Sequence, residues 1–324
     1  FSFKPQLEET AMTTQNERIT LPETTTFIMD GGLETTLIFE NGCELPEFAA
    51  FPLLDQEEGR EILRNYYSRY LSLARKNGYG FILEGPTWRA SARWGEKLGY
   101  DRLDLERINA EAINLLQDLR TVFTGYLSPI LVSGCIGPQR DGYQVTKKAT
   151  VEAAESYHQT QVGQFKQAGA DLVSAYTINY VEEAIGIVKA ARKQLIPSVI
   201  SFTVETDGRL PSGQPLGDAI TQVDTETNSA PAYYMINCAH PSHFRHVLTE
   251  DNYWLGRIKG VRSNASKKSH AELDEAEELD RGDLSEFGES NAELKKVLPN
   301  LHIFGGCCGT DHYHVAEICK HMRG

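Results

Sequence analysis

Residues 57–83, EEGREILRNYYSRYLSLARKNGYGFIL, join a long helix pattern to a short apolar strand pattern. Over residues 57–76, apolar side chains recur at the three- and four-residue spacing of one helix face: Ile62, Leu63, Tyr66, Tyr70, Leu73 and Ala74. The run Phe81–Leu83 that follows is short and wholly apolar, as is typical of a buried parallel strand. A helix and a strand in succession indicate an α/β fold.

The same alternation extends along the chain in both directions. Short apolar runs predict eight strands: Phe27–Met29, Phe81–Leu83, Ile130–Ser133, Leu172–Ala175, Ser198–Val204, Tyr233–Ile236, Ile258–Val261 and His302–Phe304. Helices are expected between and after them: Glu57–Lys76, Leu105–Val122, Val151–Ala168, Val181–Gln194, Pro215–Gln222, Pro241–Leu248, Ala292–Val297 and His312–His321. Eight such units in about 300 residues predict a single-domain (β/α)8 TIM barrel. An open, doubly wound sheet is the alternative, but no glycine-rich phosphate-binding motif follows the first strand.

The composition restricts the kinds of partner. The chain has 45 acidic and 32 basic residues and a formal net charge of −13, which argues against nucleic acid or an anionic membrane. No apolar run approaches the roughly 20 residues that cross a bilayer. Six cysteines, two of them adjacent, do not resemble a disulfide framework. We therefore expect a cytoplasmic protein. The net charge says little about a small-molecule substrate, and the composition leaves the oligomeric state open.

A polar tail precedes the predicted barrel. We expect the barrel to span residues 25–324 and the tail to cover residues 1–24, which lack the apolar core of a signal peptide. Within the tail, Met12 is a candidate native start, and residues 1–11 would then be a remnant of cloning. No linker rich in Pro, Gly or Ser divides the chain. The acidic segment Ala271–Glu289 is expected to be a solvated helix and loop.

Residues of unusual type follow the predicted strands. In a TIM barrel the active site lies at the C-terminal ends of the strands, so residues at these positions are candidate site residues. They come after the first, second, fourth, sixth and eighth strands: Asp30, Gly31, Gly32, Glu34, Thr87, Trp88, Tyr176, Asn237, Cys238, Cys307 and Cys308. Their position at one rim predicts a single site.

Cys238, Cys307 and Cys308 carry the most specific signal. Cys238 ends the sixth predicted strand and the adjacent pair ends the eighth, so these strand ends lie two apart around the rim. Zinc takes thiolates at ~2.3 Å in a tetrahedral array, and three protein ligands with one open position are typical of a catalytic site. Glycines on both sides of the pair let the backbone turn tightly. Three buried, inert thiols are the alternative interpretation.

The remaining cysteines and the histidines carry weaker signals. Cys43, Cys135 and Cys319 are interpreted as packing residues. His240, close to Cys238, is a further candidate for lining the site. The other histidines are expected on the surface or at helix ends, because a three-residue spacing drifts around a helix and forms no compact ligand set.

Three of these motifs together resemble a known family. Asp-Gly-Gly-Leu-Glu-Thr from Asp30, Asn237-Cys238 at a strand end, and Gly-Gly-Cys-Cys-Gly-Thr over residues 305–310 are similar to the hallmarks of homocysteine S-methyltransferases. This family includes betaine- and S-methylmethionine-dependent enzymes and the homocysteine module of cobalamin-dependent methionine synthase. The resemblance extends from about Phe27 to His321. It implies a (β/α)8 barrel that holds Zn²⁺ through Cys238, Cys307 and Cys308.

The resemblance also implies a reaction. Zinc would remove the proton from the thiol of homocysteine, and the thiolate would attack a methyl group on an onium donor, giving methionine. S-methylmethionine and S-adenosylmethionine are the favoured donors, and betaine remains open. Asp30, with the amides of Gly31 and Gly32, is expected to meet the amino-acid end of the substrate, and Thr87 matches a threonine of several relatives. Trp88 is a candidate for cation–π contact with the donor. No catalytic residue beyond the metal-activated thiol is expected.

Tyr176 departs from the family pattern. Relatives commonly place a glutamate at this position, after the fourth strand, to hold the homocysteine ammonium, and a phenol supplies no such charge at neutral pH. Either Asp30 or Glu34 takes over, or the acceptor is a different thiol. Arg89 is a second sign of altered specificity. A zinc-binding barrel that serves as a sensor or partner subunit without turnover is a further alternative.

Overall fold

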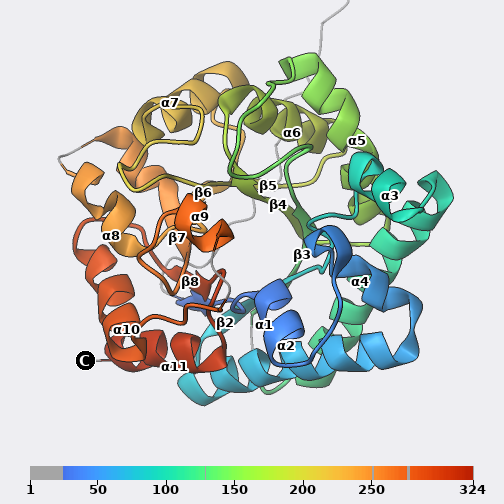
Figure 1. Cartoon of the computed structure of the whole chain (residues 1–324), viewed down its shortest axis with the longest axis horizontal. Coiled ribbons are helices and arrows are strands. Elements are labelled where there is room, and N and C mark those ends of the chain that lie inside the picture. Colours follow the sequence, from blue (N-terminus) through green and yellow to red (C-terminus); the bar gives the residue numbers. More distant parts are fainter. Residues whose placement is uncertain (1–24, 128, 250–251, 276–277, 324) are drawn as a thin grey trace, which may run out of the picture.

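The computed structural model describes residues 25–127, 129–249, 252–275 and 278–323, and it forms a closed barrel of parallel strands in sequence order (Figure 1). The tail of residues 1–24, including Met12, lies outside the described residues. The strands are β1 (Phe27–Ile28), β2 (Gly80–Glu84), β3 (Ile130–Ile136), β4 (Leu172–Ile178), β5 (Ser198–Phe202), β6 (Tyr233–Asn237), β7 (Ile258–Ser263) and β8 (Ile303–Gly306). Phe27 pairs with Gly80 of β2 on one side and Ile303 of β8 on the other, which closes the barrel. The predicted TIM barrel is confirmed.

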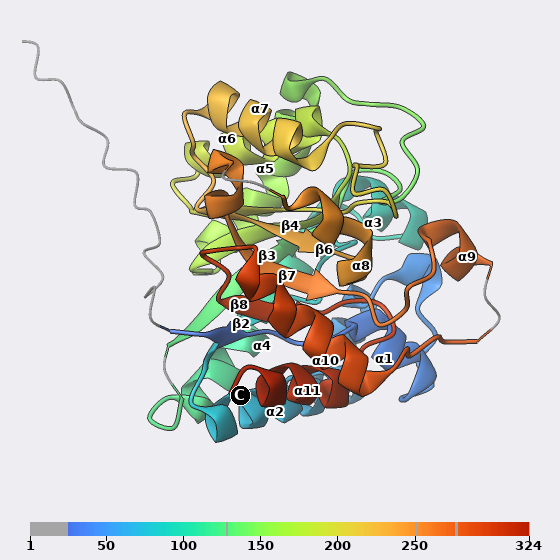
Figure 2. The ribbon, with the colours of Figure 1, turned by 90° about the vertical axis from the view of Figure 1, so that its left-hand side faces the viewer.

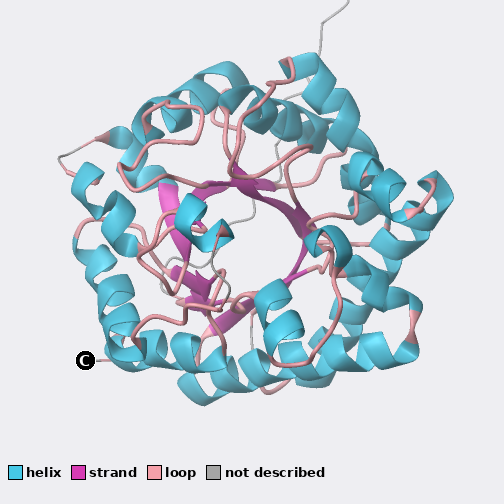
Figure 3. Cartoon of the chain, viewed as in Figure 1, coloured by secondary structure: helices cyan, strands magenta, loops and turns pink. Residues whose placement is uncertain are grey.

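Helices form a ring outside the strands (Figure 3). They are α1 (Leu33–Phe39), α2 (Glu57–Asn77), α3 (Ala92–Leu98), α4 (Arg102–Phe123), α5 (Val151–Gln167), α6 (Val181–Lys193), α7 (Leu216–Thr227), α8 (Pro241–Phe244), α9 (His270–Asp274), α10 (Leu284–Glu293) and α11 (His312–His321). Short 3-10 helices cover Pro46–Phe48, Phe51–Asp55, Arg245–Val247, Tyr253–Arg257 and Leu294–Lys296. No helix among the described residues is long and apolar enough to span a bilayer.

The structure corrects some predicted boundaries. The helix expected at Ala292–Val297 begins earlier: Asp283 accepts a hydrogen bond from the Glu286 amide and caps α10, which buries Phe287 fully. The acidic composition around Asp283 concealed this helix. The fifth strand ends at Phe202, two residues before the predicted Val204. The helices α1, α3 and α9 were not predicted, because each is too short to show a helical period.

Two apolar layers hold the barrel together. Side chains of the strands that point inward fill the barrel and include Phe27, Ile82, Tyr176, Met235 and Ile303. A larger layer lies between the strands and the helices, and the predicted apolar face of α2 belongs to it. Fully burying one such aliphatic or aromatic side chain contributes about 1.5–3 kcal/mol. The two layers leave only the rim of the barrel for polar function.

One end of the barrel is covered by short helices. Helix α9 lies over the barrel opening in Figure 1, and Figure 2 shows α1, α8 and α9 on the same side of the barrel. The residues that immediately follow the strands therefore meet beneath these elements. The cavity described below lies among them.

Candidate metal and substrate site

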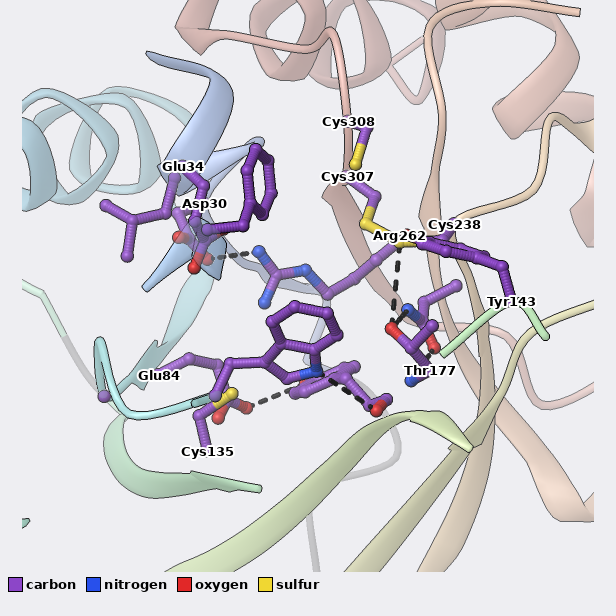
Figure 4. A pocket seen from close by; sticks show the side chains of 16 residues that line it. Asp30, Glu34, Glu84, Cys135, Tyr143, Thr177, Cys238, Arg262, Cys307 and Cys308 are labelled. Carbon is purple, nitrogen blue, oxygen red and sulfur yellow. Dashed lines mark hydrogen bonds and ion pairs between the residues drawn. A yellow bond between two sulfur atoms is a disulfide. The ribbon is translucent and has the colours of Figure 1, made fainter. Parts of the chain in front are cut away.

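A cavity at the C-terminal ends of the strands contains most of the predicted site residues (Figure 4). Its lining residues are Asp30, Leu33, Glu34, Phe48, Glu84, Gly85, Trp88, Cys135, Tyr143, Tyr176, Thr177, Asn237, Cys238, Arg262, Cys307 and Cys308. Polar and charged groups lie between aromatic side chains, as in many small-molecule sites.

Cys238, Cys307 and Cys308 meet at one side of this cavity. Their sulfur atoms lie within 4.8 Å of one another, and no other group of this kind occurs among the residues that the structure describes. Backbone hydrogen bonds fix the position of two of them: the Cys307 amide donates to the Ser263 carbonyl at 2.8 Å, and Cys238 donates to the Arg262 carbonyl at 3.1 Å. Cys238 adopts a φ of 52°, a left-handed conformation that is strained for a non-glycine residue.

When the three cysteines are reduced, their arrangement fits a zinc ion. Thiolates bound tetrahedrally at ~2.3 Å lie about 3.8 Å from one another, and all three sulfur atoms already lie within 4.8 Å of one another. In the structure, Cys238 and Cys307 are joined as a disulfide, and Cys308 lies beside them (Figure 4). Because zinc binds thiolates, Cys238 and Cys307 must be reduced before they can serve as ligands.

The two glycine-rich motifs pack against each other behind the cysteines. The Gly32 amide donates to the Thr310 carbonyl at 3.1 Å, and Thr310 Oγ1 donates to the Cys307 carbonyl at 2.7 Å. A Cβ on Gly32 would lie 2.5 Å from the Cys307 carbonyl oxygen, and one on Gly31 would lie 2.7 Å from the Tyr70 hydroxyl. The glycines of the first motif therefore permit a close approach that positions the cysteine loop.

Asp30 and Arg262 form a buried ion pair across the cavity. Arg262 Nη2 donates to Asp30 Oδ1 at 2.8 Å, and the Tyr66 hydroxyl donates to Asp30 Oδ2 at 2.9 Å. Burial alone lowers the pKa of Arg262, but the Asp30 carboxylate, together with Tyr176, Glu84 and Tyr66, more than offsets this effect and holds that pKa above its ordinary value. Arg262 is therefore a permanent cation in the cavity wall. Its guanidinium lies 5.1 Å from the centre of the Tyr176 ring.

Tyr176 is bonded to a carboxylate that the sequence analysis did not include. The Tyr176 hydroxyl donates to Glu84 Oε1 at 2.8 Å, while Glu84 Oε2 is buried without a hydrogen-bond partner. Burial raises the pKa of Glu84 to about 7. Loss of hydration also raises the pKa of Glu34, at the edge of the cavity, to about 7. The cavity thus contains two carboxyl groups that titrate near neutral pH.

Aromatic side chains form much of the remaining wall. Phe48, Trp88, Tyr143 and Tyr176 all line the cavity. The guanidinium of Arg89 is stacked 4.0 Å from the Trp88 ring centre and 3.5 Å from that of Trp94, and Trp88 Nε1 donates to the Tyr176 carbonyl at 3.3 Å. Arg89 therefore fixes the orientation of Trp88 and lies outside the cavity lining.

Some predicted residues do not line the cavity. Gly31, Gly32 and Thr87 lie behind it, and the Thr87 hydroxyl donates to the Cys135 carbonyl at 2.8 Å. His240 also lies outside the lining and caps α8 through its Nδ1 atom. Three cysteines were interpreted as packing residues. Cys319 is buried in the hydrophobic core, Cys43 packs against that core, and Cys135 is buried in the cavity wall.

Several residues that line the cavity were not predicted from the sequence. Glu84 and Arg262 each follow a predicted apolar run directly, so a charged residue at a strand end was the available signal. Phe48 and Tyr143 come from loops, and no sequence period places a loop residue in a cavity. The loop between β3 and α5 brings Tyr143 onto His270 of α9, at 4.4 Å between ring centres.

The family assignment follows from comparison with known proteins. The model of the homocysteine S-methyltransferase family matches residues 27–322. The chain belongs to the homocysteine S-methyltransferase family. The predicted resemblance is confirmed, and membership of this family makes the chain a methyl-transferring enzyme. The alternative of a barrel without turnover is therefore not retained.

Solved structures of a homocysteine S-methyltransferase share the fold. The oxidized form of MmuM from Escherichia coli has a TM-score of 0.70 and 20% sequence identity, covering 90% of this chain and 94% of that chain. The metallated form of MmuM has a TM-score of 0.69 and 17% identity, covering 92% and 97% of the two chains. A search of the curated proteins found no match. At these sequence identities, the structural similarity shows that the two proteins share a fold.

Proposed function

We propose that this enzyme transfers a methyl group from a small onium donor to the thiolate of homocysteine, in a zinc-dependent reaction that gives methionine. The observation that carries the proposal is the convergence of Cys238, Cys307 and Cys308 within 4.8 Å at the wall of the cavity. Zinc held by these thiolates would supply deprotonation and positioning of the substrate thiol at neutral pH. Asp30 and Asn237 belong to the same wall.

The aromatic wall supports a cationic donor. Trp88, Tyr143 and Phe48 offer ring faces, each of which attracts an onium group by about 0.5–2 kcal/mol. Glu34 adds a carboxyl group, which in its ionised form would attract the positive charge of the donor. Methyl transfer removes the positive charge of the donor, so a cavity with few water molecules favours the neutral product. We propose a sulfonium donor, S-methylmethionine or S-adenosylmethionine.

Tyr176 favours one alternative acceptor. The position that commonly carries a glutamate in relatives is here a phenol with a raised pKa, so it remains neutral. If no other acid binds the ammonium of homocysteine, a thiol without that group would be the substrate. The mechanism at the metal would be the same.

A screen of thiols against donors, with reduced and zinc-loaded enzyme, tests the proposal. Methylation of homocysteine by a sulfonium donor is the expected result, and betaine is included as the competing donor. Cys308→Ala should lose zinc and activity, whereas Cys43→Ala, a half-buried cysteine outside the cavity, should keep both. Full zinc content in Cys308→Ala would refute the ligand assignment.

A further inference from the structure

We propose that Glu84 and Arg262 together bind the α-amino-acid end of the thiol substrate, with Glu84 Oε2 accepting from the ammonium and Arg262 Nη1 donating to the carboxylate. The inference rests on the proposed function and names the substrate class of that site. Glu84 comes from β2 and Arg262 from β7, and strands β8 and β1 lie between these two in the closed barrel. Both line the cavity that contains the three cysteines.

Glu84 has an oxygen that requires a partner. Glu84 is 3% exposed, Oε1 accepts from Tyr176, and Oε2 meets no hydrogen-bond partner in good geometry. The Ser133 and Ser174 hydroxyls lie near enough to the carboxyl group to lower its pKa, but they bond each other at 2.8 Å. A buried acceptor without a partner is destabilising, and more so when it is charged. A ligand ammonium would satisfy this oxygen and would stabilise the ionised carboxylate. Tyr176 therefore orients the Glu84 carboxyl group. In this way Glu84 takes the place of the glutamate that relatives commonly carry at position 176.

Arg262 has a donor group that remains uncommitted. Nε donates to the Gly306 carbonyl at 3.1 Å, and Nη2 donates to Asp30 and to the Gly31 carbonyl. Nη1 has no acceptor among the described residues. Figure 4 shows the side chain of Arg262 crossing the cavity between Asp30 and the cysteines. A guanidinium held by three such bonds is already oriented to receive a carboxylate.

The other carboxylates of the cavity fit the ammonium less well. Both oxygens of Asp30 are already bonded, one to Arg262 and one to Tyr66. Neither oxygen of Glu34 is among the buried side-chain atoms that lack a hydrogen-bond partner, unlike Oε2 of Glu84. Glu84 therefore gains most from a cationic partner, and we expect Asp30 to act by orienting Arg262.

Three thiols of matched length test this assignment. Homocysteine carries both charged groups, 4-mercaptobutanoate lacks the ammonium, and 3-aminopropanethiol lacks the carboxylate. Glu84→Gln should lower kcat/KM for homocysteine and 3-aminopropanethiol by roughly tenfold to a hundredfold, with little effect on 4-mercaptobutanoate. Arg262→Lys should impair homocysteine and 4-mercaptobutanoate but not 3-aminopropanethiol, because Lys keeps the charge beside Asp30 but lacks the planar fork.

A matched cavity variant and a binding measurement complete the test. Glu34→Gln should leave the preference for homocysteine over 4-mercaptobutanoate unchanged. Calorimetric binding of L-methionine, the expected product, should weaken in Glu84→Gln independently of turnover. An unaltered thiol preference and unaltered methionine binding in Glu84→Gln would overturn the inference. Methionine binding that depends on Glu84, without methylation of any thiol by wild-type enzyme, would instead refute the proposed function.

Discussion

The side chain of Asn237 supports the strained backbone beside the cysteines. Its amide oxygen accepts from the Thr177 amide at 3.0 Å and from the Ser201 hydroxyl at 2.6 Å, and its nitrogen donates to Thr177 Oγ1 at 2.9 Å. Thr177 has a φ of 60°, which is unusual for a β-branched residue and costs of order 1–3 kcal/mol. These bonds offset that cost, and Cys238 follows Asn237 directly.

Replacing Asn237 by Ala should therefore affect both stability and the metal. The substitution leaves the buried Thr177 amide without an acceptor, so we expect the free energy of unfolding to fall by about 1–3 kcal/mol. Zinc affinity should also decrease, because Cys238 loses its support. Chemical denaturation and zinc titration measure the two effects. Asn300→Ala, at an exposed position, is the control, and equal zinc affinity in both variants would contradict the positioning role.

Glu84 should make stability depend on pH. Its pKa is about 7 in the fold and 4.5 in its ordinary state, so the folded protein binds the proton more tightly. This stabilisation is complete below pH 4.5 and is lost as the pH rises to about 7, amounting to at most about 3 kcal/mol. Its charged and titratable neighbours are Arg262, Tyr176, Cys135 and Tyr233.

Denaturant unfolding of the apo enzyme between pH 5 and pH 8 measures this effect. Wild type should lose stability relative to Glu84→Gln as the pH rises to 7, and the difference should then stay constant. The comparison with Glu84→Gln removes the contribution of Glu34, which titrates in the same range. Parallel curves for the two proteins would show that Glu84 is already ionised at pH 5.

At the scale of elements, the loop after β1 supports the loop after β8. Gly32 lies against the Cys307 carbonyl, and a Cβ there would lie 2.5 Å from that oxygen. Gly32→Ala should push the two loops apart, costing about 1–3 kcal/mol of stability and much of the zinc affinity. Gly256→Ala, where the added Cβ meets one atom at 3.5 Å, is the matched control. Thermal unfolding and zinc content check both variants, and an unchanged zinc content in Gly32→Ala would contradict this coupling.

The long elements could be predicted from the sequence, whereas the short ones could not. The 21 residues of α2 contain several turns, so its apolar face repeats often enough to be recognised. The five residues of α9 contain little more than one turn, and only its capping box, formed by Ser269 and Glu272, marks it. Yet α9 places His270 Nε2 2.5 Å from the Cys238 carbonyl oxygen. The elements that cover the site were therefore the least predictable.

At the scale of the whole molecule, barrel closure explains why the convergence of the three cysteines could be predicted from the sequence, whereas the rest of the cavity could not. Cys238 and Cys307 are 69 residues apart, but two strands with known order bring their ends together. The pairing of Asp30 with Arg262 joins residues 232 apart through side-chain length and direction, which a strand pattern does not define. The unpaired oxygen of Glu84 likewise became visible only when its surroundings were in place.

Zinc K-edge spectroscopy of the reduced, zinc-loaded enzyme tests the central claim most directly. Without substrate, the account predicts three sulfur ligands, from Cys238, Cys307 and Cys308, and one lighter atom. With saturating homocysteine, the lighter atom should be replaced by a fourth sulfur at ~2.3 Å. A shell of three sulfurs and one light atom that stays unchanged under saturating homocysteine would contradict activation of the thiol at the metal.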